Sequence, residues 1–273
     1  MDDLPQNSAV PFFHLTTFSK RPFGGNPAGV CLLRHWLPDR TLLAITAETA
    51  LPVVAFLVRT GAALELRWFT AVVEEEMCGH ATLAAAWVCF NRLDTGAADV
   101  TFATRAGPLR VARDGDELVL DLPARPPHPV ADRPDIAAAL GATPVGYLQS
   151  VYNIALFASA AEVAGLAPDF DRVARLDRPG LIVTAPGAGF DCDIVTRYFA
   201  PAKGIPEDAA TGSAHAQIVP YWSKRLGRAR LTARQLSARS GAMICEDLGS
   251  HVRITAPVRP FLHGELLLEA ETI

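Results

Sequence analysis

The 273-residue sequence predicts an α/β protein of two similar domains, each with a strand, an acidic loop and the start of a helix of small residues. The first observation is the stretch 74–87, EEEMCGHATLAAAW, where acids, a thiol, a glycine and a histidine precede small apolar residues. Alanine loses least on entering a helix, so we expect a tightly packed helix here. The polar residues then lie at the helix N-terminus, where unpaired N–H groups and the helix dipole favour a carboxylate.

The second observation is a second copy of this arrangement. Residues 67–71 (RWFTA) resemble residues 197–201 (RYFAP). If the second loop is two residues longer, residues 77–82 (MCGHAT) align with residues 209–214 (AATGSA). That alignment predicts three pairs of counterparts: Glu76 and Asp208, Cys78 and Ala210, and His80 and Gly212. A repeat of this length indicates two similar domains, and if they face each other, two helix N-termini converge on one cleft.

The third observation is the segment 123–129, PARPPHP, in which the prolines enforce an extended path typical of a linker. We place the domain boundary there. Residues 1–123 form the predicted N-terminal domain and residues 124–273 the C-terminal domain. We allow for the C-terminal strand returning to the first domain.

The remaining elements follow from local patterns. Apolar runs and alternation predict strands at residues 12–18, 53–58, 64–70, 100–123, 145–157, 181–184 and 192–199, and in the tail from residue 231. Apolar residues at helical spacing predict helices at residues 40–50, 135–140, 161–166, 170–176 and 214–226. Residues 21–30 (RPFGGNPAGV) are dense in glycine and proline, which predicts a loop. That loop either only turns the chain or delivers the Asn26 amide to a ligand.

Composition restricts the function classes. The formal net charge of −4 argues against nucleic acid as a partner. The five cysteines lack disulfide or zinc-ligand spacing and the histidines are scattered, so we predict no metal site and a reducing compartment. Neither a secretory leader nor a membrane-spanning apolar run is visible, so we expect a cytoplasmic protein without a membrane partner.

Four pieces of the sequence together resemble the phenazine-biosynthesis PhzF-like family. They are PFGGNPAGV, RWFTAVVEEEMCGHATLAAAW, DIVTRYFAPAKGIPEDAATGSAHAQIVPYW and ARQLSARSGAM. That family is similar in fold to diaminopimelate epimerase. The resemblance implies two diaminopimelate-epimerase-like α/β domains, each a mixed sheet wrapped around a central helix, with the active site in the cleft between them. It also suggests a homodimer.

The resemblance implies an isomerase without a cofactor, which moves a proton and a double bond on a small carboxylic acid, in secondary metabolism. By motif match, His80 and Asp208 take the positions of the family's polar catalytic residues. The N–H groups of residues 79, 80, 212 and 213 fall where family backbone groups hold the substrate carboxylate. The predicted substrate-binding residues are Asn26, Gly79, Thr211, Gly212 and Ser213.

One departure from the family pattern affects the mechanism. Family members usually carry a Ser-Glu-Thr sequence before an Ala-Phe strand, and that glutamate is the principal acid/base. Here residues 51–56 read LPVVAF, which puts Val53 at the glutamate position. Glu48 takes that position only in a shifted alignment. A valine cannot transfer a proton, so another group takes over or the activity is lost.

Cys78 and Glu76 are candidates to take over. Cys78 stands at the position of one catalytic cysteine of the epimerase relatives, and Ala210 replaces the other. A thiol at a helix N-terminus can have a lowered pKa, although a free cysteine can equally be a small buried hydrophobe. We predict Cys78 as catalytic and keep Glu76 as a substitute base. Two alternatives stay open: a catalytically lost protein that binds a small carboxylate, and a one-cysteine epimerase.

Overall fold

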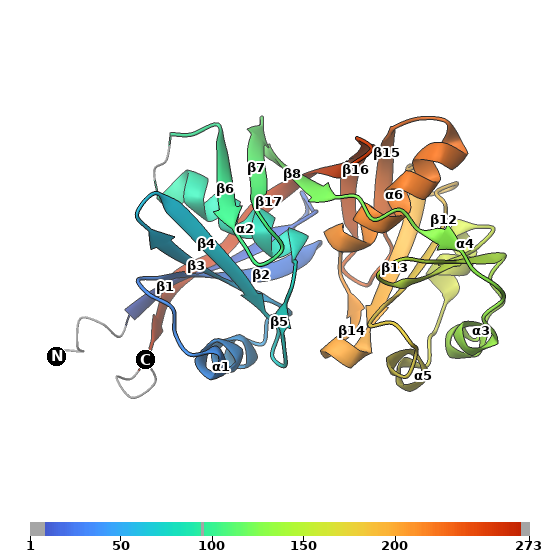
Figure 1. The fold of residues 1–273 in the computed structure, drawn as a ribbon, viewed down its shortest axis with the longest axis horizontal. Coiled ribbons are helices and arrows are strands. Elements are labelled where there is room, and N and C mark those ends of the chain that lie inside the picture. The colour runs from blue at the N-terminus through green and yellow to red at the C-terminus, as the bar shows by residue number, and fades with distance from the viewer. Residues whose placement is uncertain (1–8, 94–95, 269–273) are drawn as a thin grey trace.

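The computed structural model describes residues 9–93 and 96–268, which form two lobes side by side (Figure 1). The N-lobe holds helices α1 (Asp39–Thr49) and α2 (Gly79–Arg92). Its strands are β1 (Ala9–Thr17), β2 (Asn26–Leu33), β3 (Val54–Thr60), β4 (Ala63–Phe69), β5 (Glu74–Glu75), β6 (Asp99–Ala103), β7 (Leu109–Asp114) and β8 (Glu117–Pro123).

The C-lobe is also built from helices and strands. Its helices are α3 (Pro134–Leu140), α4 (Ala160–Gly165), α5 (Phe170–Ala174) and α6 (Gly212–Leu226), with the short 3-10 helix η1 (Pro201–Lys203). Its strands are β9 (His128–Pro129), β10 (Gly146–Gln149), β11 (Asn153–Leu156), β12 (Leu181–Pro186), β13 (Ile194–Ala200), β14 (Ile205–Asp208), β15 (Arg230–Gln235) and β16 (Gly241–Asp247). The last strand, β17 (His251–Leu267), runs along both lobes (Figure 1).

The strands of the N-lobe close into a barrel around α2. Strands β1, β2, β3, β4, β6, β7 and β8 pair in succession, and β17 pairs with both β8 and β1. Helix α2 is therefore buried on nearly every side, as its apolar composition requires. Its alanines permit this enclosure because their side chains are small.

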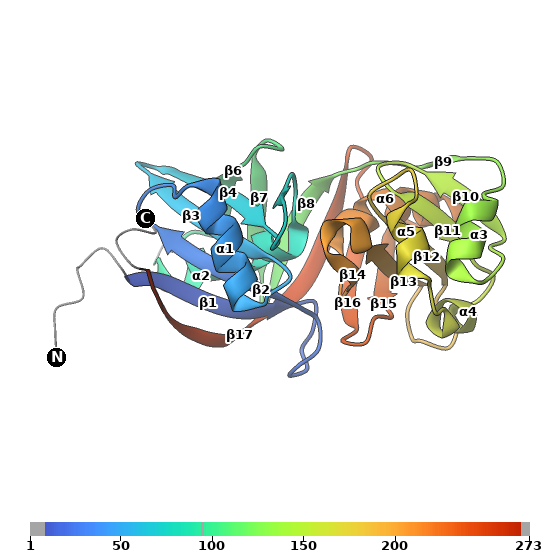
Figure 2. The ribbon, with the colours of Figure 1, turned by 90° about the horizontal axis from the view of Figure 1, so that it is seen from below.

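The C-lobe repeats the plan around α6. Strands β10, β11, β12, β13, β15 and β16 pair in succession, β16 pairs with β17, and β9 pairs with β10. In each lobe the central helix connects two parallel strands, β4 to β6 around α2 and β13 to β15 around α6. Helix α1 of one lobe and helices α3 and α5 of the other lie outside the sheets, on one side of the molecule (Figure 2). The predicted α/β fold, with a mixed sheet wrapped around each central helix, is confirmed.

The repeat is real, but its predicted alignment is wrong by one residue. Strand β5 pairs Glu75 with Trp68, whereas β14 pairs Asp208 with Tyr198, and the central helices begin at Gly79 and Gly212. The second loop is thus three residues longer than the first, because η1 is inserted in it. The true counterparts are Glu75 and Asp208 instead of Glu76, Cys78 and Thr211 instead of Ala210, and His80 and Ser213 instead of Gly212.

An arginine–glutamate pair supports this register in both lobes. The Nε and Nη2 atoms of Arg67 each lie 2.7 Å from the Glu74 carboxylate, and those of Arg197 lie 2.7 and 2.9 Å from Glu207. Each guanidinium also lies 5.0 Å from the centre of a phenylalanine ring two residues further along its strand. Bidentate pairs of this geometry hold both acidic loops against the strands that precede them.

Two local predictions need correction. The strand predicted at residues 145–157 is a hairpin of β10 and β11, with a turn at residues 150–152. The glycine- and proline-rich loop ends at Gly25, and residues 26–33 form β2. Gly25 makes the turn with a φ of 69°, a conformation that favours glycine.

Strand β17 connects the lobes. Its first part pairs with β8 and β16, and its second part pairs with β1 along residues 258–267. The division of the chain at residues 123 and 124 stays a prediction. Within the described residues, none of the helices is long and apolar enough to cross a membrane.

Candidate active site

Helices α2 and α6 begin at the same place between the lobes. A Cβ atom added to Gly79 would lie 3.6 Å from the Cα atom of Gly212, and one added to Gly212 would lie 3.7 Å from the Cα atom of Gly79. Neither preceding residue, Cys78 or Thr211, caps its helix through its side chain. First-turn N–H groups have no partner within a helix, so two sets of donors and two positive dipole ends meet here. Such a junction favours an anion.

A small cavity of about 40 Å³ lies at this junction. The N-lobe contributes Val53, Glu75, Met77, Cys78, Gly79 and His80 to its wall, and the C-lobe contributes Tyr152, Tyr198, Lys203, Asp208, Thr211, Gly212 and Ser213. Ligand sites usually have volumes of roughly 300–1,000 Å³. The lobes therefore have to part, or their loops to move, before a substrate enters.

The Asp208 carboxylate is held by hydrogen bonds on both oxygens. The Asn26 Nδ2 atom donates to its Oδ1 atom over 2.7 Å, and the Thr211 hydroxyl donates to its Oδ2 atom over 2.5 Å. The Gln235 amide donates to the Asp208 carbonyl over 2.7 Å and accepts from the Thr211 N–H over 2.8 Å. Because Asp208 is only 6% exposed, these contacts fix a charged group at the cavity wall.

His80 and Cys78 form a second polar pair. The Cys78 Sγ atom lies 3.3 Å from the His80 Nδ1 atom. Burial lowers the pKa of His80, although the charge of Asp208 acts in the opposite direction, so the imidazole is neutral at pH 7. The His80 Nε2 atom is buried and has no hydrogen-bond partner among the described residues. It is thus available to a ligand in the cavity.

Cys78 is a thiol and not a thiolate. Burial raises its pKa, and the charges of Glu75 and Asp208 add to the effect, whereas the Ala81 N–H group and Lys203 act against it. Of the two possibilities for Cys78, a lowered pKa at the helix N-terminus does not apply here, because loss of hydration outweighs the effect of the helix.

An ion pair joins the lobes across the cavity. Lys203 is in η1, which follows β13, and Glu75 is in β5. The Lys203 Nζ atom lies 2.6 Å from the Glu75 Oε2 atom. Burial acts to lower the pKa of Lys203, but Tyr152 and Glu75 outweigh it and the pKa is raised. The Tyr152 and Tyr198 rings lie 4.9 Å apart, and the Tyr198 hydroxyl is buried without a partner in the described part of the chain. Burial also raises the pKa of Tyr198.

The other predicted residues divide into two groups. Val53 lines the cavity and is 2% exposed, so the valine faces the site. Asn26 is fully buried behind Asp208, and its amide N–H groups are engaged by Asp208 and the Ala210 carbonyl. Glu48 is exposed on α1 and Glu76 is exposed beside β5, and neither belongs to the described residues that line the cavity.

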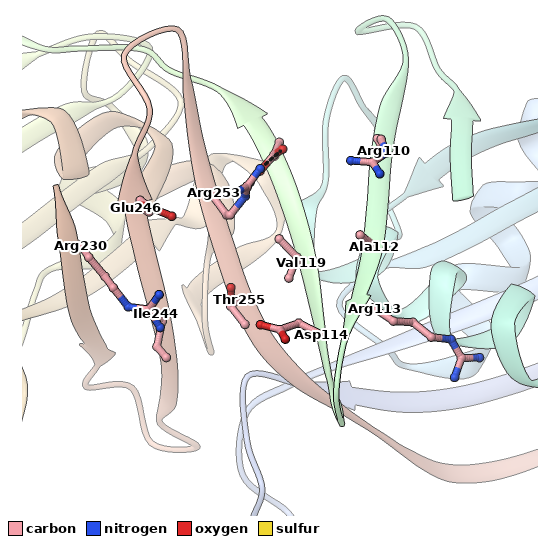
Figure 3. Close-up of a pocket in the computed structure, with 11 residues that line it drawn as sticks. Arg110, Ala112, Arg113, Asp114, Val119, Arg230, Ile244, Glu246, Arg253 and Thr255 are labelled. Carbon is pink, nitrogen blue, oxygen red and sulfur yellow. Dashed lines mark hydrogen bonds and ion pairs between the residues drawn. The ribbon is translucent and has the colours of Figure 1, made fainter. Parts of the chain in front are cut away.

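A larger groove of about 330 Å³ lies elsewhere, on the open face of strands β15, β16, β17, β8 and β7 (Figure 3). Arg253 in this groove is paired with Asp121 over 2.8 Å, and Arg110 is paired with Asp99 over 2.7 Å. Alternate residues of these strands, such as Leu120 and Leu122, point the other way, toward the helix N-termini. The groove is therefore separated from the cavity by the sheet and contains none of the predicted site residues.

Comparison with known proteins shows the family and the fold of the chain. A family model described as "Phenazine biosynthesis-like protein" matches residues 15–255. An uncharacterized isomerase of Pseudomonas aeruginosa, PA2770, is 42% identical over 259 residues, which cover 95% of this chain and 99% of that protein. The crystal structure of a PhzF-family phenazine biosynthesis protein from Enterococcus faecalis is 37% identical with a TM-score of 0.89, covering 94% of this chain and 98% of that chain.

A more distant structure shares the fold alone. The crystal structure of a hydroxyproline epimerase from Agrobacterium vitis has a TM-score of 0.62 at 10% identity and covers 97% of this chain and 94% of that chain. Two lobes with opposed central helices and a polar cavity between them thus define an α/β protein with an epimerase-like fold. More narrowly, the chain belongs to the phenazine biosynthesis-like, or PhzF-like, family and is of isomerase type.

Sequence reasoning missed several residues of the cavity and its surroundings. Lys203, Tyr152 and Tyr198 line the cavity, and Gln235 supports Asp208 and Thr211 from behind. A signal for Gln235 was present, because it is a polar residue within the motif ARQLSARSGAM. Tyr198 stands in the repeated aromatic strand at the position of Trp68, which is a second signal.

Proposed function

We propose that this protein is a cofactor-independent isomerase that moves a proton, and with it a double bond, on a small carboxylic acid in secondary metabolism. The observation that carries the proposal is the contact of Gly79 with Gly212, with His80 and Asp208 on the wall of the same cavity. The substrate carboxylate binds the N–H groups of residues 79, 80, 212 and 213. A homodimer and a cytoplasmic location are further proposals from the resemblance, and sedimentation analysis tests the dimer.

Each part of the cavity has a chemical role in this proposal. Removal of a proton next to a carboxylate, or along a chain conjugated with it, puts negative charge on the carboxylate oxygens. Donors fixed at two helix N-termini stabilise that charge without reorganising. Asp208 serves as an acid/base and is kept in place by Asn26 and Thr211. The neutral His80 imidazole binds the substrate through its Nε2 atom, and Cys78 holds its Nδ1 side.

Deuterium incorporation from heavy water tests the proposal. The probes are but-3-enoate and hex-3-enedioate with their 2-enoate isomers, followed by NMR. We expect the wild type to incorporate deuterium. In Asp208→Asn the rate of incorporation should be at least about 100-fold lower than in the wild type. Asp171→Asn, an exposed aspartate on α5, is the control and keeps the wild-type rate. Absence of exchange by the wild type, or an unchanged rate in Asp208→Asn, would contradict the proposal.

A second candidate function is binding without catalysis. Val53 favours it, because an apolar side chain occupies the position expected for the family's acid/base. Val53→Glu distinguishes the two functions. Exchange that occurs only in Val53→Glu would identify a carboxylate-binding protein that lost its chemistry with the glutamate. A one-cysteine epimerase is less well supported, because the counterpart of Cys78 is Thr211, whose hydroxyl is not an acid/base near neutral pH.

A further inference from the structure

Glu75 occupies in the N-lobe the place that Asp208 occupies in the C-lobe. Glu75 pairs with Trp68 of β4, and Asp208 pairs with Tyr198 of β13. Each of the two acidic residues lies four positions before the glycine that begins the central helix of its lobe. Both residues line the cavity. The two lobes thus present one carboxyl group each to the same small space.

The surroundings of Glu75 suit proton transfer better than those of its neighbours. Glu74 is engaged by Arg67 and Arg105, and Glu76 is exposed. The Glu75 side chain is 13% exposed and its one ion-pair partner among the described residues is Lys203, from the opposite lobe. A carboxylate with one ammonium partner keeps lone pairs free for a substrate proton.

We propose that Glu75 is the second acid/base of this site and replaces the glutamate missing at Val53, with Lys203 as its partner. The inference rests on the proposed isomerase function. Val53 and Glu75 are both in the N-lobe wall of the cavity, so a base at Glu75 acts from the same lobe as the family glutamate. Asp208 acts from the other lobe.

The proton transfers balance between the two carboxyl groups. The Glu75 carboxylate removes a proton from a substrate carbon, and the electron pair of that C–H bond moves into the conjugated carboxylate. Asp208, a carboxylate in the resting protein, takes up a proton from solvent and gives it to the substrate at the second position. Glu75 then releases the proton that it removed to solvent, and both carboxyl groups return to their resting state. No electrons are gained or lost overall.

Lys203 stabilises the charge as it moves. It neutralises the Glu75 carboxylate in the resting protein, where the Lys203 Nζ atom lies 2.6 Å from the Glu75 Oε2 atom. When Glu75 becomes protonated, the negative charge passes to the substrate, and the ammonium remains beside the cavity to balance it. Lys203 therefore positions Glu75 and assists the intermediate without transferring a proton itself.

Variants of Glu75 test the inference against a purely structural ion pair. Glu75→Gln lowers deuterium incorporation and isomerisation of but-3-enoate and hex-3-enedioate by about 100-fold or more. Glu76→Gln, the adjacent exposed glutamate, is the matched control and keeps the wild-type rate. The double variant Glu75→Gln with Lys203→Met also stays inactive, because the acid/base is still missing. Recovery of the wild-type rate in the double variant would overturn the inference, since Glu75 would then only neutralise Lys203.

Two further outcomes separate this inference from the proposed function. If the wild type is active, Asp208→Asn is inactive and Glu75→Gln is fully active, the inference fails and the isomerase function stands. If the wild type exchanges no deuterium, both fail. Glu75→Asp is the control for misfolding. It retains the negative charge beside Lys203, but its side chain is one methylene shorter, so the carboxylate lies further from the substrate. We expect it to keep the thermal unfolding midpoint and lose at least about tenfold of kcat.

Discussion

Gly79 and Gly212 bring the N-termini of the two central helices into van der Waals contact. Cβ atoms added to them would lie 3.4–3.7 Å from their nearest neighbours, which is ordinary contact. Neither residue has a positive φ. Glycine is thus not required for the backbone to fold at these positions. What glycine provides is the close approach of the two helix starts at the wall of the cavity.

Gly79→Ala should therefore weaken ligand binding without unfolding the protein. The added methyl group lies between the two helix starts, 3.6 Å from the Gly212 Cα atom, and crowds the cavity wall that Gly79 forms. We therefore expect affinity for small carboxylates to fall at least about tenfold, or about 1.4 kcal/mol. The free energy of unfolding should stay within about 1 kcal/mol of the wild type, because alanine is the better helix former. Isothermal titration and urea unfolding measure the two effects. Gly146→Ala in β10, which adds a methyl group at a similar distance from its neighbours, is the control. Equal affinities of the two variants would contradict the assignment.

Asn26→Ala should reduce both stability and activity. It removes the donor to Asp208 and the donor to the Ala210 carbonyl, both buried. Leaving a buried carboxylate oxygen without this partner costs about 2–3 kcal/mol. Urea unfolding at neutral pH measures the loss, and the exchange assay should show a slower rate. Asn91→Ala, which removes one exposed hydrogen bond within α2, should change stability by less than about 1 kcal/mol. A comparable loss in both variants would argue against the role of Asn26.

His215 should make stability depend on pH. Its ring is fully buried one turn inside α6, with Nδ1 2.8 Å from the Thr211 carbonyl, and burial lowers its pKa from 6.5 to about 4. Between these values the unfolded chain binds a proton at this residue and the folded chain does not. The free energy of unfolding therefore falls by about 3 kcal/mol as the pH drops from 6.5 to 4, and this contribution is constant above 6.5.

Chemical unfolding at several pH values measures this slope. His80, whose pKa is also lowered by burial, contributes in the same direction. His215→Gln should lose most of the slope attributed to residue 215, whereas His251→Gln, on the exposed start of β17, should keep it. Identical slopes in the two variants would show that the pH dependence has another source.

The two arginine–glutamate pairs should differ in their contribution to stability. Arg197 also donates to two backbone carbonyl groups at the end of α4, and its side chain is 10% exposed. Arg197→Met leaves Glu207 and the Leu166 carbonyl without this partner, at an expected cost of about 3–5 kcal/mol. Arg67→Met should cost only about 1–2 kcal/mol, because Arg105 still pairs with Glu74. Thermal and urea unfolding rank the variants, and the reverse order would contradict this account.

Much of the fold was predictable because its signals are local. The alanine-rich run after Gly79 marks a buried helix, and the repeated strand before each acidic loop marks the two halves. His80 and Asp208 could be predicted because they stand in motifs that resemble the PhzF-like family, and both line the cavity. The loop length was not predictable, since η1 depends on contacts made only after folding. The resulting slip of one residue selected Glu76 instead of Glu75.

The residues that support the site required the tertiary structure. Lys203 reaches Glu75 from 128 positions away, and Gln235 at the end of β15 reaches Thr211 from 24 positions away. No spacing in the sequence predicts such contacts. The ionisation of Cys78 likewise depends on the balance between the helix N-terminus and loss of hydration, and only the surrounding structure shows that burial prevails.

The pairing of β17 with β1 determines when the barrel of the N-lobe can close during synthesis. Ala9, in the first strand, lies opposite Leu267, in the last one. The barrel around α2 therefore has an open seam until residues 258–267 have left the ribosome, although the other described strands of that lobe are made before residue 124. Domains made early usually fold while the rest is still being translated. Here the first lobe has to wait for the second, and contacts so distant in sequence favour slow folding.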